Sequence, residues 1–487
     1  MFARRRMDDF GKSEEGTVLA IWAVSFAVLF GIVALSFDLG RIAITQTELQ
    51  SFADSVALAA AGELDGQDDS ITRARLAAAT LIADTKTYGS GDAALAGAAD
   101  YTLTFLSALP VSDTVPVSAV TTDPAEAIYA RVVVNGSTVD LTFAAVFMAQ
   151  TGAAGPDNTV AASAVAGFTQ YACDITPLMF CLPNANYAAD DNIGDMIQLR
   201  SGGNGAAWGP GNFGFLDPAR VLVDQSGPCA GLSPGRLDRC LMGAIGSITQ
   251  CFVQRGVDTQ PGQRVGITNA VFNVRFDIYR SGFAGERTNP VYAPAPNVIK
   301  GIIPNGGGSC IGGSERVSPN SVGLPRDACL VAGTCGRVGD GNWAAGRVNY
   351  VLRNYGGIDP HPTATTRYQY YLAEIARAGG AASRRAILTG RAETGRPICS
   401  NNQSNDPERR VVIAAGIDCT ANPINGSETG VPVEEFFRLF LTEPVGDDGT
   451  SPPRVDIWAE VVGSAGGDGS GTASENGIFR DVVQLYR

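Results

Sequence analysis

The feature that most limits how this chain can fold is a charge-free run of 22 residues at positions 16–37, "GTVLAIWAVSFAVLFGIVALSF". As a helix, the run is long enough to cross about 30 Å of hydrocarbon. It is longer than the apolar core of a usual secretory signal, which has about 7–15 residues. No later stretch of the sequence is both as long and as apolar. We therefore predict a single-pass membrane protein with a transmembrane helix over residues 16–38.

The charges around this run predict its orientation. Four basic residues lie before it and one lies close after it: Arg4, Arg5, Arg6 and Lys12, then Arg41. Basic residues favour the cytoplasmic side of a membrane. We therefore expect residues 1–15 to form a cytoplasmic tail and residues 38–487 to lie outside the cytoplasm. A cleaved export signal, with a small-residue site at "ALSF" (34–37), is the alternative.

The alanine-rich segment that follows the run contains no proline and reads as a continuation of the same helix over residues 39–69. A helix from Thr17 to Gly62 would be roughly 70 Å long. Apolar residues recur along it at helical spacing: Leu39, Ile42, Leu49, Phe52 and Val56. This stripe predicts a surface that packs against partner helices. Packing of the helix on its own domain is the alternative that the composition leaves open.

The order of the apolar run, a D-L-G step and an L-Q-x-x-A-D step resembles the N-terminal module of TadG-like proteins of the Tad (tight adherence, Flp) pilus assembly systems. The residues that carry this resemblance are Asp38, Leu39, Gly40, Leu49, Gln50, Ala53, Asp54, Ala57, Leu58, Ala59 and Ala60. Residues 171–181, 211–217 and the C-terminal tail also look similar to members of that family. The resemblance implies a protein of the bacterial inner membrane whose partners are pilin-like or secretion-platform proteins.

The chain departs from cleaved pilins at one position. Pilins cut by a prepilin peptidase carry glutamate as the fifth residue after the cleavage-site glycine, whereas Ile21 is the fifth residue after Gly16 here. A carboxylate at that depth in the membrane would need a partner. We therefore expect no pilin-type processing and no role as the major fibre subunit.

Charge and composition exclude some classes of partner. The formal net charge is −13, which argues against binding to nucleic acid or peripheral binding to anionic lipid. The single histidine, His361 in "DPHPT", excludes sites that need two, and the simplest interpretation is an exposed loop residue.

The ten cysteines all lie at or after Cys173, and none forms a C-x-x-C pair. An even number of scattered cysteines in an exported region favours disulfides. Reduced cysteines in the core are the alternative.

The expected fold class is α+β: a transmembrane helix continuing into a stalk helix, then a mixed, strand-rich and loop-rich exported region. We divide the exported region into a small α+β unit (70–170) and a cysteine-containing α+β domain (171–487). Helices are expected at 70–89, 365–379 and 433–441. Strands are expected at 101–107, 127–135, 138–147, 159–170, 271–279, 409–417, 455–463 and 481–486, with a hairpin turn at Asn135 and Gly136.

Motifs that suggest chemistry are weak. "GLSPG" (231–235) matches a nucleophile elbow, but Pro234 lacks the N–H that an oxyanion hole needs. "GPGNFG" (209–214) lacks a clear strand before it and helix after it. "VLVDQSG" (221–227) and the acidic, glycine-rich turns at 446–450 and 466–471 lack a full metal-ligand pattern. We expect no enzyme activity and no cofactor.

These observations favour a membrane-anchored, non-enzymatic component of Tad/Flp-type pilus assembly, either a scaffold or a minor pilin-like subunit with a role in adhesion. Its C-terminal domain would be periplasmic or surface-facing. A membrane-tethered surface adhesin or glycan-binding module is the alternative, because the glycine-rich loops and acidic surface also permit it.

Overall fold

The computed structural model describes residues 15–91, 93–110, 112, 115–145, 158–173, 175–200, 213–216, 227–244, 251–253, 256–260, 270–306, 308–312, 314–425, 427–447, 455–466 and 478–486. The chain forms two compact units, Met1–Thr169 with Val482–Arg487, and Gln170–Asp481. The last six residues therefore belong with the N-terminal unit, a return that the sequence pattern does not predict.

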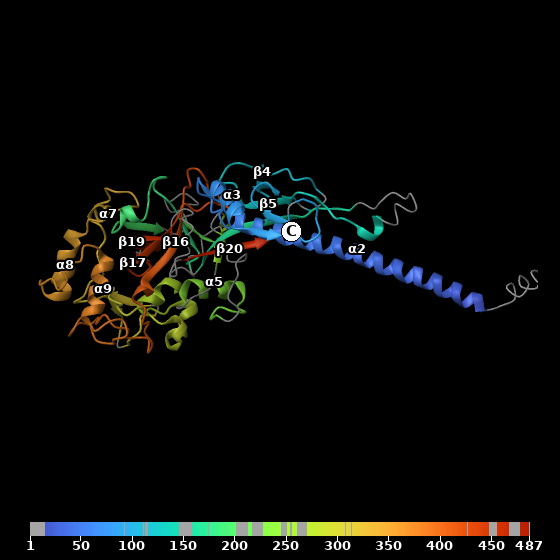
Figure 1. Ribbon diagram of the computed structural model, residues 1–487. Coiled ribbons are helices and arrows are strands. Elements are labelled where there is room, and N and C mark those ends of the chain that lie inside the picture. Colours follow the sequence, from blue (N-terminus) through green and yellow to red (C-terminus); the bar gives the residue numbers. More distant parts are fainter. Residues whose placement is uncertain are drawn as a thin grey trace, which may run out of the picture. The chain divides into compact units, whose positions relative to one another are not determined.

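The first unit is built on helix α2 (Glu15–Ala61), a single helix of 47 residues. At about 1.5 Å per residue it is roughly 70 Å long. Figure 1 shows its N-terminal part extending away from the strands of its own unit. The helix ends at Ala61, and Gly62 donates its backbone N–H to the carbonyl of Leu58. The prediction that the apolar run continues unbroken into the alanine-rich segment is confirmed, but residues 62–69 form a turn and not the end of the helix.

A short helix and an antiparallel sheet complete the first unit. Helix α3 (Ser70–Thr80) follows the turn, which Arg73 holds through ion pairs with Glu63 and Asp65, both at 2.6 Å. The sheet has the order β8 (Ser163–Cys173), β5 (Tyr129–Val134), β3 (Tyr101–Leu106), β4 (Val120–Thr121), and β20 (Phe479–Leu485) also pairs with β8. Two small pairs lie beside it: β1 (Ala83–Thr85) with β2 (Ala94–Ala96), and β6 (Ser137–Thr138) with β7 (Thr159–Val160).

The second unit contains a mixed sheet in which β9 and β16 are parallel and the other pairs are antiparallel. Its order is β10 (Met196–Arg200), β19 (Val455–Gly466), β17 (Glu435–Leu441), β16 (Val411–Ile417), β9 (Leu178–Cys181), β11 (Phe213–Leu216), β13 (Thr259–Gln260), and β18 (Gly446–Asp447) pairs with β19. The smaller strands are β12 (Cys251–Val253), which pairs with residues 171–173, and the pair β14 (Ile302–Pro304) and β15 (Glu315–Val317).

Helices and 3-10 turns surround this sheet within the second unit. The helices are α5 (Pro234–Gly243), α7 (Ala328–Ala332), α8 (Ala344–Tyr355) and α9 (Arg367–Arg377). The 3-10 turns are η1 (Asp190–Asn192), η3 (Val274–Phe276), η4 (Ser281–Phe283), η5 (Glu286–Thr288), η6 (Pro290–Tyr292) and η7 (Pro407–Arg410). The predicted α+β class is confirmed.

Five of the local predictions are wrong. The helix expected at 70–89 ends at Thr80, and residues Ala83–Thr85 form strand β1. The expected helix at 433–441 is strand β17, because it lies between β16 and β19 and buries both of its faces. The expected strand at 271–279 is helical and turns at Asp277, whose φ of 63° is left-handed. Residues 142–145 are helical, not strand. No hairpin forms at Asn135, because β5 pairs with β3 and β8.

The cysteines of the second unit lie at disulfide distance, as the sequence favours. Four bonds join Cys181 to Cys419, Cys229 to Cys240, Cys310 to Cys399 and Cys329 to Cys335. Cys173 is also disulfide-bonded, and in the strand register it lies opposite Cys251.

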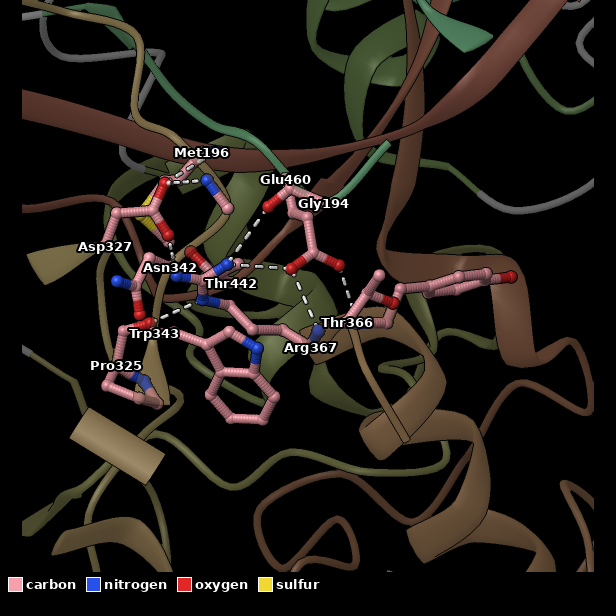
Figure 2. A network of polar contacts seen from close by, with 12 residues as sticks. Gly194, Met196, Pro325, Asp327, Asn342, Trp343, Thr366, Arg367, Thr442 and Glu460 are labelled. Carbon is pink, nitrogen blue, oxygen red and sulfur yellow. Dashed lines mark hydrogen bonds and ion pairs between the residues drawn. The ribbon is translucent and has the colours of Figure 1, made fainter. Parts of the chain in front are cut away.

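A buried ion-pair network around Arg367 joins separate elements of the second unit. Figure 2 shows the guanidinium of Arg367 between Asp327 and Glu460, and all three side chains are fully buried. Arg367 donates to a carboxylate oxygen of Asp327, to Oε2 of Glu460 at 2.9 Å, and to the carbonyl of Pro325 at 2.6 Å. Glu460 also accepts the backbone N–H groups of Arg367 and Tyr368, at 2.9 and 2.7 Å.

The network joins the start of α9 to β19 and to the residue that precedes α7. Burial raises the pKa of Glu460, and the charge of Arg367 acts against that shift. Nearby, burial and the charges of Asp327 and Asp340 raise the pKa of Asp195 to about 6. Removing the guanidinium would thus leave two buried carboxylates without their cation.

We predict that Arg367→Ala lowers the free energy of unfolding of the second unit by about 3–5 kcal/mol, because it leaves buried charges unpaired. The matched control is Arg438→Ala. Arg438 pairs with Glu408, and their side chains are 30% and 47% exposed. A half-exposed pair of this kind contributes about 1 kcal/mol or less. Denaturant unfolding of the purified full chain, followed by tryptophan fluorescence, measures both. Equal losses would contradict the assigned importance of the network.

We also predict that the disulfides contribute unequally. The loop-closure relation gives about 5 kcal/mol for Cys181–Cys419 and about 2 kcal/mol for Cys329–Cys335, because the sequence separations are 238 and 6 residues. The double variants Cys181→Ser with Cys419→Ser, and Cys329→Ser with Cys335→Ser, compare the two bonds by their unfolding midpoints. A larger loss in the second variant would refute this order.

Candidate functional site

The part of α2 beyond the apolar run buries one face inside the first unit. Leu49, Phe52, Ala53, Val56 and Ala57 are all 0% exposed. They share a core with the strands of the sheet, and the ring of Phe52 lies 6.1 Å from that of Tyr101. Small side chains at 53 and 57 allow the helix and the sheet to approach closely.

The five residues of the expected partner-packing stripe therefore divide into two groups. Leu49, Phe52 and Val56 contact their own domain, which is the alternative that the sequence left open. Leu39 is 54% exposed, and Ile42 is half-buried against the same core. The stripe continues the periodicity of the helix, but its members do not share one environment.

A row of polar side chains on α2 fastens the rest of the unit to the helix. Gln46 donates its side-chain N–H to the carbonyl of Ala161 at 3.0 Å. Gln50 donates to the carbonyl of Ser163 at 3.1 Å and to a carboxylate oxygen of Asp54 at 2.7 Å. Glu48 accepts the backbone N–H of Thr87 at 2.8 Å. The family-motif residues Gln50 and Asp54 thus position strand β8 along the helix.

Asp38 makes the corresponding contact where the apolar run ends. It is 4% exposed and accepts the backbone N–H groups of Phe143 and Ala144, at 3.1 and 2.7 Å. These amides open the helical residues 142–145, so the carboxylate satisfies N–H groups that no helical carbonyl can reach. The sequence signal for this row was present, because Gln46, Gln50 and Asp54 follow one another at four-residue steps, but it did not identify their hydrogen-bond partners.

One motif residue is not explained by packing within the chain. A Cβ added at Gly40 would meet nothing within 4 Å. Ile44, four residues further on the same face, is 45% exposed. This face of α2 is open at the level of the D-L-G step.

The remaining candidates show no assembled catalytic set among the described residues. Ser233 directly precedes α5, whose first residue is Pro234, so "GLSPG" is a helix start.

His361 is half-buried and not exposed as expected: its ring lies 5.0 Å from that of Tyr370, and burial lowers its pKa. No group of three or more possible metal-ligating side chains occurs in the described parts of the chain. Most of "GPGNFG" and "VLVDQSG" lies outside the described residues.

Among the described residues, α2 is the one helix long and apolar enough to cross a membrane, and none of its most apolar window is buried. This fits a single-pass membrane anchor.

Comparison with known proteins agrees with the features of α2. Residues 16–63 match a protein family described as putative Flp pilus-assembly TadE/G-like. The predicted resemblance of the N-terminal module to TadG-like proteins is therefore confirmed. No curated protein and no solved structure matches the chain.

We predict that Phe52→Ala lowers the free energy of unfolding of the first unit by about 3–5 kcal/mol, because it leaves a cavity between α2 and the sheet. Leu58→Ala is the control, since Leu58 on the same helix is 37% exposed. The control should cost about 1 kcal/mol or less. Denaturant unfolding in lipid nanodiscs compares the two variants. Similar costs would mean that the buried face does not hold the unit together.

Proposed function

We propose, from the TadE/G-like character of residues 16–63, that this chain is a membrane-anchored, non-enzymatic component of Tad/Flp-type pilus assembly. It would act as a scaffold or minor pilin-like subunit in the inner membrane. The N-terminus would be cytoplasmic, and both folded units would lie in the periplasm or face the surface. The observation that carries the proposal is that the matched segment coincides with α2. This helix is long and apolar enough to be a membrane anchor, and its later part lies in the core of the first unit.

The face of α2 that carries Gly40 and Ile44 is the best candidate for a contact with pilin-like or secretion-platform helices. Internal packing occupies Leu49, Phe52 and Val56, so these side chains are not free to meet another subunit. Gly40 lies in open space, and a glycine on an exposed helix face lets a second helix approach closely. Leu39, the exposed member of the expected stripe, directly precedes Gly40 on α2.

We predict that Gly40→Leu reduces partner association and piliation while leaving the isolated protein as stable as before or more stable. The reason is that a Cβ at position 40 meets no atom of its own chain within 4 Å, and leucine favours a helix over glycine by about 0.5–1 kcal/mol. Co-purification from native membranes and counts of surface pili measure the first effect. The unfolding midpoint measures the second. Normal piliation by Gly40→Leu would rule out this face as the contact.

A photo-cross-linking residue at Ile44 identifies the partner directly, with the same residue at Leu76 as control. Leu76 is 62% exposed on α3, a separate helix of the same unit. Adducts with pilin-like or secretion-platform proteins at 44 and not at 76 would support the assembly role. Adducts only with envelope proteins or glycans would favour the tethered adhesin instead.

A further inference from the structure

An aromatic side chain from a distant part of the first unit lies against the end of the membrane-spanning run. Phe37 is the last residue of the charge-free segment and is 59% exposed. Its ring lies 6.0 Å from that of Phe143 in an edge-to-face arrangement. Phe143 is itself 45% exposed, so the pair presents apolar surface instead of closing a core.

The position of Phe143 is fixed by contacts on its other side. Asp38 accepts the backbone N–H groups of Phe143 and Ala144. Arg41 donates to the carbonyl of Asp140 at 3.2 Å and to the hydroxyl of Thr142. Asp38 and Arg41, about one turn apart on α2, therefore hold residues 140–144 beside the helix. The start of the short helix at 142–145 lies at the level of the last turn of the apolar run.

The surrounding side chains have the composition of a membrane–water boundary. Arg41 lies over the ring of Tyr88 at 5.2 Å, and Tyr88 is 39% exposed. Aromatic residues with a polar end, together with basic residues, gather where a helix leaves the hydrocarbon. Asp38, the first acidic residue after the run, is buried and hydrogen-bonded, so its carboxylate does not face the lipid.

We propose that Phe143, with Phe37, forms a second lipid-contacting surface of the protein, seated in the bilayer at the point where α2 leaves it. The occupant of this surface is the acyl chains and headgroups of the surrounding membrane. The surface is continuous with the membrane-spanning run, because α2 carries Phe37 to the edge of the hydrocarbon and a ring in contact with Phe37 lies at the same depth. Residues 141–145 carry no charge, which is compatible with that position.

The surface contributes more than adhesion to the membrane. Because Asp38 and Arg41 connect it to α2, it adds a second point of contact beside the helix. One helix can rotate about its own axis in a bilayer, whereas a helix with a fixed lateral contact presents one face outward. The inference depends on α2 crossing the membrane and not on a role in pilus assembly.

A photoactivatable diazirine analogue of phenylalanine at position 143 tests the proposal in the full chain in native membranes. Irradiation followed by mass spectrometry separates lipid adducts from protein adducts. We expect lipid adducts at 143, as at position 30 inside the span. Positions 76 and 120 are matched controls, because Leu76 and Val120 are 62% and 57% exposed on the same unit. We expect no lipid adducts at either control.

Each possible result shows whether Phe143 contacts lipid. Lipid adducts at 143 and 30, with none at 76 and 120, support the proposal. Adducts at 143 only with another protein would show that a subunit and not lipid covers this surface. Solvent-quenched products alone at 143 would show that it faces water. An unchanged protease-cleavage pattern of the substituted protein checks that the fold is intact. A loss of piliation with the lipid adducts at position 143 unchanged would bear on the proposed function and would not contradict this inference.

Discussion

The first unit depends on a single constraint: the helix that can cross the membrane is the same helix that fills the core of the folded unit. Residues after Phe37 continue without a break to Ala61, about 36 Å further along the axis. No flexible linker separates anchor from domain. The sheet packs directly on Leu49, Phe52 and Val56, so the position of the unit above the membrane is set by the register of those contacts on α2.

This constraint explains why α2 carries two kinds of motif residue. Ala53 and Ala57 are small because the sheet approaches closely there, and Gln50 and Asp54 satisfy polar groups at the margin of that contact. Polar groups at such a margin need partners, since a buried donor or acceptor without one destabilises the fold by about 1–3 kcal/mol. Asp38 follows the same rule beside the membrane, where lipid offers no hydrogen bond.

The sequence predicts α2 well because two independent signals agree: an uncharged run of spanning length and an apolar period that continues past it. It predicts β16, β19 and α9 because β-branched content or helical periodicity is strong there. It fails at β17, where "EFFRLFL" has no decisive period and neighbouring strands bury both faces. It also fails to find the acceptor of Gln46 and the donors to Asp38, because those contacts join residues about 100 positions apart.

The two units reach stability by different means. The first contains no cysteine and relies on the apolar contact between α2 and the sheet. The second is rich in loops, whose ordering is entropically unfavourable. There, disulfides and the buried pairs of Arg367 join segments far apart in the sequence. The second unit also has an apolar core, which includes residues outside its strands such as Phe272 and Phe276. Its shape therefore depends on that core together with long-range links, whereas the first unit is organised around one helix.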